Sequence, residues 1–203
     1  TKFIVYKFNK LGYRDEEWPE NIDNCVWAIG DSFTVGIGQP FEETWPQLVQ
    51  TKLQTRVINI SMNGASATWI ARRAKFIIDN FNPKTILIQW SYVHRREDPD
   101  ASKLDEDRAL PVDPLDVADF ENLTANIMLV ESIKLSTVVI HSFIPKFFDG
   151  ENDLPKATVL YNMLDTSNIL YFPPPDQADV ARDGYHYDIL TSTHYANSYV
   201  NLL

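Results

Sequence analysis

Five short runs of apolar and β-branched residues recur along the chain. Within each run the apolar residues are nearly continuous rather than alternating with polar ones, which is typical of strands that are covered on both faces. We therefore predict a parallel sheet of five strands. Their predicted bounds are Cys25–Ile29, Arg56–Ile60, Thr85–Gln89, Thr137–His141 and Asn168–Tyr171.

Segments with helical spacing lie between these runs. In Ala67–Asn80 the residues Ile70, Ala74, Ile77 and Ile78 recur at intervals that line one face of a helix. Alternating strands and helices predict an open α/β sheet with right-handed crossovers and helices on both faces. The other predicted helices are Glu43–Leu53, Val117–Ile133, a less regular segment at Thr158–Leu164, and Ile189–Leu202.

Two segments do not follow this alternation. The first, residues 1–22, predicts an extended arm that packs on the outside of the sheet. The second, Glu97–Pro114, is rich in acidic residues and proline, so it predicts a solvated loop rather than a buried element. The second segment begins like a calcium loop at Asp98, but Lys103 stands where such a loop requires glycine and Ala109 where it requires the closing glutamate. We expect no metal site.

The chain length of 203 residues suits one domain, and we find no internal repeat or linker that would divide it. We therefore expect a single domain over residues 1–203. Its 18 basic and 28 acidic residues give a net charge of −10. This charge disfavours nucleic acid and acidic membrane surfaces as partners. The oligomeric state is left open.

Cysteine content and hydropathy suggest the compartment. Cys25 is the only cysteine, so the chain cannot form an internal disulfide or build a zinc site from cysteines. No uncharged stretch approaches the roughly 18 residues of a membrane span, and the first residues are too interrupted by charge for the apolar part of a signal peptide. We expect a cytoplasmic protein.

A glycine, an acid and a serine follow the first predicted strand, at Gly30–Ser32. Open α/β sheets bind their ligands at the carboxyl ends of the strands, so Ser32 lies at a favourable position. The segment is not a phosphate loop, because no lysine follows its glycines. It is also not a dinucleotide fingerprint, because Phe41 occupies the place of the third glycine after Gly36 and Gly38.

Near the other end of the chain, Asp183 precedes His186 by three residues, after the fifth predicted strand. This spacing can place both side chains on one side of a turn, where the carboxylate orients the imidazole and leaves the other ring nitrogen to act as a base. A serine hydroxyl needs such a base within hydrogen-bond reach to become a nucleophile. Asp183 and His186 are therefore candidates to activate Ser32.

These residues resemble the SGNH, or GDSL-type, esterases and lipases. Gly30–Ser32 is similar to the first block of that family, Asp183–His186 is similar to its last, and Asn59 followed by Gly64 is similar to its second. The resemblance implies a flavodoxin-like three-layer α/β/α sandwich with a five-stranded parallel sheet. It also implies that Ser32 is the nucleophile, His186 the general base and acid, and Asp183 its orienting carboxylate.

The resemblance further implies an oxyanion hole made by the backbone N–H groups of Ser32 and Gly64. The third block of the family usually supplies an asparagine as another donor, whereas Ser91 occupies that position here. A serine hydroxyl can donate a hydrogen bond, so Ser91 is a candidate third donor. The neighbouring candidates for substrate binding are Gln89, Trp90, His94 and Arg95. The alternative for Arg95 is that it neutralises the acidic loop that follows.

The expected activity is that of a serine ester hydrolase that acts through an acyl-enzyme on a small acyl ester, with a carbohydrate O-acetyl ester as the preferred substrate class. No cofactor is expected. Two alternatives remain open. The same triad would serve an O-acyltransferase, and a carbohydrate-binding or structural module could keep the fold with weakened catalysis.

Overall fold

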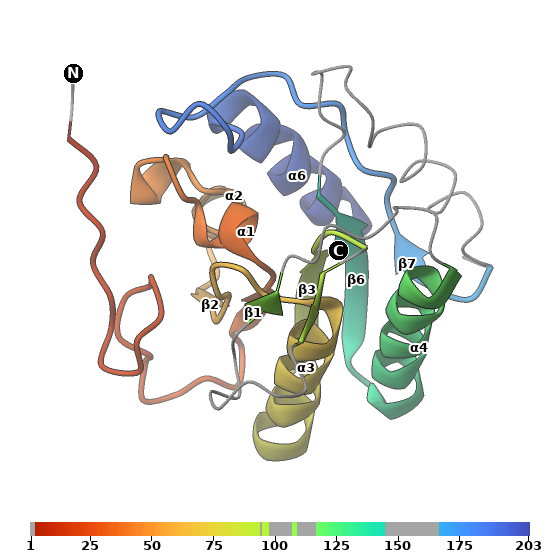
Figure 1. Cartoon of the computed structure of the whole chain (residues 1–203). Helices are drawn as coiled ribbons and strands as arrows, with labels where there is room; N and C mark the ends of the chain where they lie inside the picture. The colour runs from red at the N-terminus through yellow and green to blue at the C-terminus, as the bar shows by residue number, and fades with distance from the viewer. Residues whose placement is uncertain (1–2, 94, 98–106, 109–116, 145–166) are drawn as a thin grey trace.

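The computed structural model describes residues 3–93, 95–97, 107–108, 117–144 and 167–203, and these form an α/β sandwich (Figure 1). One sheet has five parallel strands in the order β2-β1-β3-β6-β7. The predicted fold class and all five predicted strands are confirmed, with small shifts at the strand ends. The strands are β1 Val26–Ile29, β2 Val57–Asn59, β3 Thr85–Trp90, β6 Val138–Phe143 and β7 Leu170–Tyr171.

The helices also follow the predicted pattern. Two of them, α4 and α6, have the predicted bounds, and the predicted helix at Thr158–Leu164 lies outside the described residues. The long helix α3 begins where Ser66 caps it, because the Ser66 hydroxyl accepts a hydrogen bond from the N–H of Trp69 at 3.1 Å. The helices are α1 Ser32–Val35, α2 Trp45–Leu53, α3 Ala67–Phe81, α4 Val117–Ile133 and α6 Ile189–Leu202, with a short 3₁₀ helix, η1, at Phe41–Glu43.

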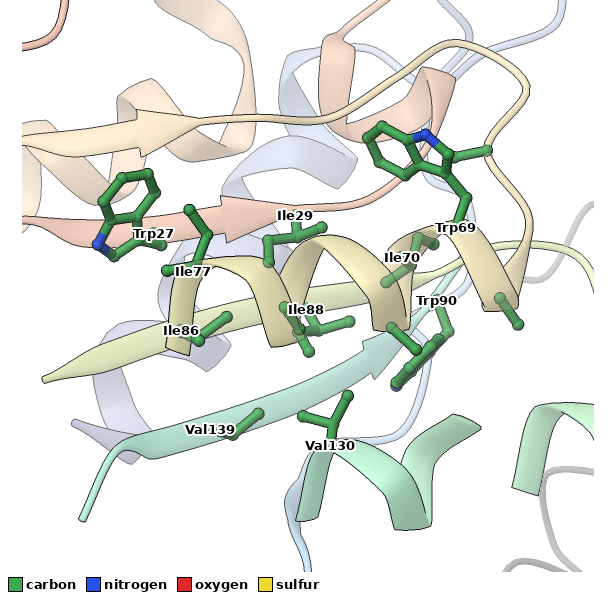
Figure 2. Packing of buried hydrophobic residues seen from close by; sticks show 14 of the residues in the cluster. Trp27, Ile29, Trp69, Ile70, Ile77, Ile86, Ile88, Trp90, Val130 and Val139 are labelled. Atoms are coloured by element: carbon green, nitrogen blue, oxygen red, sulfur yellow. The ribbon is translucent and has the colours of Figure 1, made fainter. Parts of the chain in front are cut away.

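Each face of the sheet is covered by a pair of helices (Figure 1). Successive residues of a strand point to opposite faces. In β3, Ile86 and Ile88 pack with α3 and α4, whereas Leu87 packs with α2 and α6. Figure 2 shows the first of these two cores, where side chains of β1, β3 and β6 meet those of α3 and α4. Burial on both faces explains why the strands have continuous apolar sequences.

The strand register brings three loops to one edge of the sheet. Ile29, the last residue of β1, pairs with Ile88 of β3, and Asn59, the last residue of β2, pairs with Ala28. The chain segments that follow β1, β2 and β3 therefore leave the sheet side by side. These segments carry Ser32, Gly64 and Ser91, which is the arrangement that a shared site requires.

Residues 3–22 lie at the β2 edge of the sheet, along the outside of the sandwich (Figure 1). Asp15 is buried there, forms an ion pair with Arg56 at 2.7 Å, and accepts a hydrogen bond from the N–H of Asn59 at 3.1 Å. Trp18 packs edge-on against Trp27 of β1, with the two rings 5.2 Å apart. The arm is therefore held by buried polar groups as well as by apolar packing.

A short antiparallel ribbon begins one residue before the segment predicted as a solvated loop and includes part of it. Its strands are β4 Arg96–Glu97 and β5 Asp107–Arg108. Glu97 forms an ion pair with Arg72 of α3 at 2.6 Å. The rest of the predicted loop Glu97–Pro114 lies outside the described residues.

Within the described ranges, every helix is too short or too polar to cross a lipid bilayer. The same ranges contain no group of three or more histidine, cysteine or acidic side chains arranged to hold a metal ion.

His141 is a buried core histidine with two partners. Trp90 donates its indole N–H to Nδ1 of His141 at 3.0 Å, so Nε2 carries the ring proton and donates to Glu131 at 3.0 Å. Burial lowers the pKa of His141 more than the contact with Glu131 raises it, and Lys134 adds to the lowering.

This environment predicts a pH dependence of stability. Because the folded-state pKa lies below the unfolded value of about 6.5, the unfolded chain binds more protons between the two, and the stabilisation is complete above pH 6.5 and lost below it. Between pH 7.5 and pH 5.5, urea unfolding should show a larger loss of stability for the wild type than for His141→Gln. Equal losses in the two proteins would contradict this assignment.

Candidate active site

Ser32 is the first residue of the four-residue helix α1, directly after β1. Asp31 caps this helix, because its Oδ1 accepts a hydrogen bond from the N–H of Phe33 at 3.0 Å. The first N–H groups of a helix have no acceptor within the helix, so the N–H of Ser32 is free to face a ligand. Ser32 itself is buried, at 5% exposure. The turn thus holds the serine at the carboxyl edge of the sheet.

Asp183 and His186 form a tight pair in the loop before α6. Oδ2 of Asp183 lies 2.5 Å from Nδ1 of His186, and its Oδ1 accepts hydrogen bonds from the N–H groups of Tyr185 and His186 at 3.0 Å each. Partial burial raises the pKa of Asp183, but the hydrogen bonds from His186 and Tyr185 outweigh this effect and the pKa is lowered overall. The ionised carboxylate accepts, so Nδ1 of His186 carries the proton.

The other ring nitrogen of His186 is available as a base. With the proton on Nδ1, Nε2 has a lone pair, and this buried atom has no hydrogen-bond partner among the described residues. The imidazole lies beside the Ser32 turn, because its ring centroid is 4.6 Å from that of Phe33. Tyr187 ties the same two segments together by donating its hydroxyl to the carbonyl of Phe33 at 3.2 Å. The fold therefore brings the candidate base to the neighbourhood of the candidate nucleophile.

Asp179 anchors the loop that carries the Asp183–His186 pair. Its carboxylate accepts hydrogen bonds from the N–H groups of Leu190 and Thr191 at 2.6 and 3.1 Å, at the start of α6. Within the loop, the N–H of Ala181 donates to the carbonyl of His186 at 2.6 Å. These contacts close the loop onto the helix and restrict the orientation of His186.

Gly64 lies in the loop after β2 with a positive φ of 83°, a conformation that favours glycine. A Cβ at this position would meet no atom within 4 Å, and the N–H of Gly64 has no acceptor in the described part of the chain. The loop is fastened to the Ser32 turn, since Met62 donates its N–H to the carbonyl of Gly30 at 3.2 Å. The geometry is thus compatible with a backbone donor that faces open space.

Ser91 differs from the sequence prediction. Its hydroxyl donates its one hydrogen to Oδ2 of Asp31 at 2.6 Å, and it accepts a hydrogen bond from Nη1 of Arg95 at 3.0 Å. Ser91 therefore supports Asp31 in this structure and supplies no oxyanion donor. Nη1 of Arg95 also lies 3.3 Å from Oδ2 of Asp31, so Arg95 binds this buried carboxylate. Most of the acidic loop that Arg95 was alternatively expected to neutralise lies outside the described residues.

Ser91 and Arg95 both bind the carboxyl group of Asp31, which is buried and needs polar partners. Complete burial raises the pKa of Asp31, whereas the positive charge of Arg95 and the hydrogen bonds from Ser91 and Phe33 act in the opposite direction. A buried carboxylate without such partners would be strongly unfavourable. Ser91 and Arg95, which lie at the third block, thus hold the carboxyl group that caps the Ser32 helix.

Replacing Ser91 with alanine tests this reassignment. Loss of a hydrogen bond to a buried carboxylate should lower the free energy of unfolding by about 2 kcal/mol. We expect kcat to fall by less than about tenfold, because removal of a true oxyanion donor costs about 10²–10³-fold. Urea unfolding and ester hydrolysis measure the two effects. A loss of 10²-fold or more in kcat at unchanged stability would show instead that Ser91 is a donor of the oxyanion hole.

Gln89 and Trp90 also differ from the prediction. Both are fully buried in β3. Oε1 of Gln89 accepts a hydrogen bond from the Thr34 hydroxyl at 2.8 Å, and its Nε2 donates to the Tyr187 hydroxyl at 3.2 Å. The indole of Trp90 donates to His141. Their polar atoms are therefore used within the core, and neither side chain is placed to bind a substrate. The remaining candidate, His94, lies outside the described residues.

Two tyrosines of the site were not singled out from the sequence: Tyr185, which packs against His186, and Tyr92, which contacts Tyr185. The hydroxyls of Tyr92 and Tyr185 contact each other, which joins the segment after β3 to the loop before α6. The ring of Tyr185 lies 5.2 Å from that of His186 and is 53% exposed. Because Tyr185 directly precedes His186 in the sequence, its place beside the Asp183–His186 pair could have been predicted.

The sequence matches no protein-family model and no curated protein. Structural comparison is more informative, because solved structures of SGNH hydrolases share this fold at low sequence identity. The architecture is that of the SGNH, or GDSL-type, fold.

Three of these structures illustrate the likeness. A lipolytic protein of the G-D-S-L family from Veillonella parvula DSM 2008 has a TM-score of 0.64 at 12% identity, over 87% of this chain and 96% of that chain. The psychrotrophic esterase EstA from Pseudoalteromonas sp. has a TM-score of 0.57 at 16% identity, over 88% and 96%. A family two carbohydrate esterase from Clostridium thermocellum, solved with cellohexaose, has a TM-score of 0.55 at 14% identity, over 93% and 68%.

Proposed function

We propose that the protein is a serine ester hydrolase of the SGNH type, with Ser32 as nucleophile, His186 as general base and acid, and Asp183 as the orienting carboxylate. The observation that carries the proposal is the hydrogen bonding of the two ring nitrogens of His186. Asp183 holds its Nδ1–H, and its buried Nε2 has no partner among the described residues, beside the turn that bears Ser32.

The first half of the reaction forms an acyl-enzyme. Nε2 of His186 takes the proton of the Ser32 hydroxyl while Oγ bonds to the acyl carbon of the ester, which gives a tetrahedral intermediate. Asp183 stabilises the imidazolium that results. When the intermediate collapses, the bond to the alcohol oxygen breaks, and this oxygen takes the proton from Nε2. The alcohol leaves and the acyl group stays on Ser32.

The second half returns the free enzyme. His186 removes a proton from water, whose oxygen bonds to the acyl carbon, and the collapse of the second intermediate returns a proton to Oγ of Ser32. The carboxylic acid leaves. In both halves the negative oxygen would accept hydrogen bonds from the N–H groups of Ser32 and Gly64, which have no backbone acceptor in the described structure.

The substrate we favour is a small acyl ester, with an O-acetyl group on a carbohydrate as the preferred class. The half-exposed ring of Tyr185, next to His186, can stack on the apolar face of a sugar. The likeness to a carbohydrate esterase solved with cellohexaose supports the same class.

Hydrolysis of p-nitrophenyl acetate, butyrate and octanoate by the wild type tests the activity and the acyl preference. We expect the highest kcat/KM with acetate. Release of acetate from an acetylated xylo-oligosaccharide tests the carbohydrate class, with the deacetylated oligosaccharide as a control for binding alone. A folded protein that binds the oligosaccharide but hydrolyses none of these esters would favour the binding module over the enzyme.

Transfer to an acceptor is distinguished in the same assay. The acyl-enzyme can react with an alcohol in place of water, so product analysis in the presence of methanol or a free oligosaccharide separates the two outcomes. We expect free acetate as the main product. An acylated acceptor as the main product would favour the O-acyltransferase.

A further inference from the structure

The N-terminal arm holds the loop that follows α1. Arg14 is buried, at 2% exposure. Its guanidinium donates hydrogen bonds to the carbonyl groups of Val35 at 3.0 Å, of Gly36, and of Gln39 at 2.7 Å. One arginine thus satisfies three carbonyl groups at the end of the helix that begins with Ser32. No other type of side chain has enough donors in a fixed fork to do this.

A second residue of the arm binds the same loop. The N–H of Gly38 donates to the hydroxyl of Tyr6 at 2.8 Å. The guanidinium of Arg14 lies over the ring of Tyr6, 4.3 Å from its centroid, so the two arm residues also hold each other.

The opposite side of this loop touches the Asp183 segment. The N–H of Arg182 donates to the carbonyl of Gly38 at 3.3 Å. Gly38 has a φ of +80°, and a Cβ at this position would lie 2.8 Å from Cβ of Ala181 and 3.0 Å from Oδ1 of Asp183. Glycine is therefore required here for close approach as well as for its conformation. The backbone of Gly38 therefore contacts the arm on one side and closely approaches the candidate catalytic carboxylate on the other.

We propose that the N-terminal arm positions the catalytic pair. Arg14 and Tyr6 hold residues 35–39 against residues 181–183, and this contact sets how Asp183 meets Nδ1 of His186. Arg14 is thus a positioning residue that acts through the loop and touches no reacting atom. The proposal rests on the proposed function, because a geometry of this kind matters for turnover only if His186 is the base.

Replacement of Arg14 with glutamine tests the proposal. Misplacement of a catalytic group by a distant change can cost about 10²-fold in rate. We expect Arg14→Gln to lower kcat for p-nitrophenyl acetate about 10- to 100-fold with little change in KM. Gly38→Ala, which disturbs the same contact from the other side, should have a similar effect. The matched control is Arg56→Gln, which removes another arginine that binds the arm, through Asp15, but does not contact residues 35–39.

A second readout does not require turnover. The proton that His186 donates from Nδ1 to Asp183 can be followed by NMR in protein labelled with ¹⁵N-histidine. We expect its resonance to shift or disappear in Arg14→Gln and Gly38→Ala and to persist in Arg56→Gln. If Arg14→Gln does not fold, Tyr6→Phe removes only the hydroxyl that Gly38 binds and should change kcat and the resonance in the same direction, by less.

Two results would overturn the proposal: an unchanged His186 resonance in both Arg14→Gln and Gly38→Ala, or an equal loss of kcat in Arg14→Gln and Arg56→Gln. Failure of the proposed function gives a different result. In that case the wild type hydrolyses no ester, while the resonance still reports whether the arm positions the pair.

Discussion

Replacing Ser32 with alanine should lower kcat/KM for p-nitrophenyl acetate by about 10⁴- to 10⁶-fold, because the nucleophile is removed while substrate binding and the backbone donors remain. The substitution removes only the hydroxyl group, and without it no acyl-enzyme can form. Ser32 is the first residue of α1, and the Asp31 cap does not use its side chain. The fold and its stability should therefore be close to those of the wild type.

Ser61→Ala is the matched control for this variant. Ser61 is also buried near the carboxyl edge of the sheet, and its hydroxyl has no hydrogen-bond partner among the described residues. We expect the activity of Ser61→Ala to stay within about threefold of the wild type, because the substitution removes no hydrogen bond to a described residue. Residual hydrolysis by Ser32→Ala at more than a hundredth of the wild-type rate would exclude Ser32 as the nucleophile.

Replacing Asp183 with asparagine should lower kcat about 10³- to 10⁴-fold while KM changes little. The asparagine amide can donate to Nδ1 of His186, which favours the tautomer with the proton on Nε2. That tautomer cannot accept the proton of Ser32. Asp183 also accepts two backbone N–H groups through Oδ1, and the amide oxygen of asparagine can keep these bonds. The loss should therefore appear in catalysis rather than in folding.

Asp188→Asn is the control for the second variant. Asp188 lies in the same loop, five residues further on, and its Oδ1 has no partner among the described residues. Burial raises the pKa of Asp188, with a further contribution from Asp179, so removal of its charge should not destabilise the protein. We expect wild-type activity from this variant. An Asp183→Asn protein as active as Asp188→Asn would remove Asp183 from the mechanism.

The sheet and its helices were predictable because burial on both faces leaves a direct mark on the sequence. Each strand is a continuous apolar run, and α3 repeats its apolar residues at helical intervals. Ser32, Asp183 and His186 were predictable as candidates because their residue types and order resemble a known family. The chemistry of a serine and a base then required that the fold bring them together.

The roles that the sequence did not predict correctly, or did not predict at all, depend on contacts between segments that are distant in the sequence. Gln89 ends a predicted strand, which gives its place in the sheet but not the partners that fix its side chain in the core. Ser91 was assigned to the oxyanion hole by its position in a motif, although its hydroxyl binds Asp31, 60 residues earlier. Arg14 binds a loop more than 20 residues away, and no local pattern in the arm indicates that contact.

The central claim is that Ser32 is a nucleophile activated by His186, and covalent labelling tests it most directly. A fluorophosphonate is a suitable probe, because an activated serine oxygen bonds to its phosphorus while fluoride leaves. Intact mass and peptide mapping should show one adduct on Ser32 in the wild type, slow labelling in His186→Ala and none in Ser32→Ala. An adduct that persists in Ser32→Ala, or a folded wild type that acquires no adduct, would contradict the account.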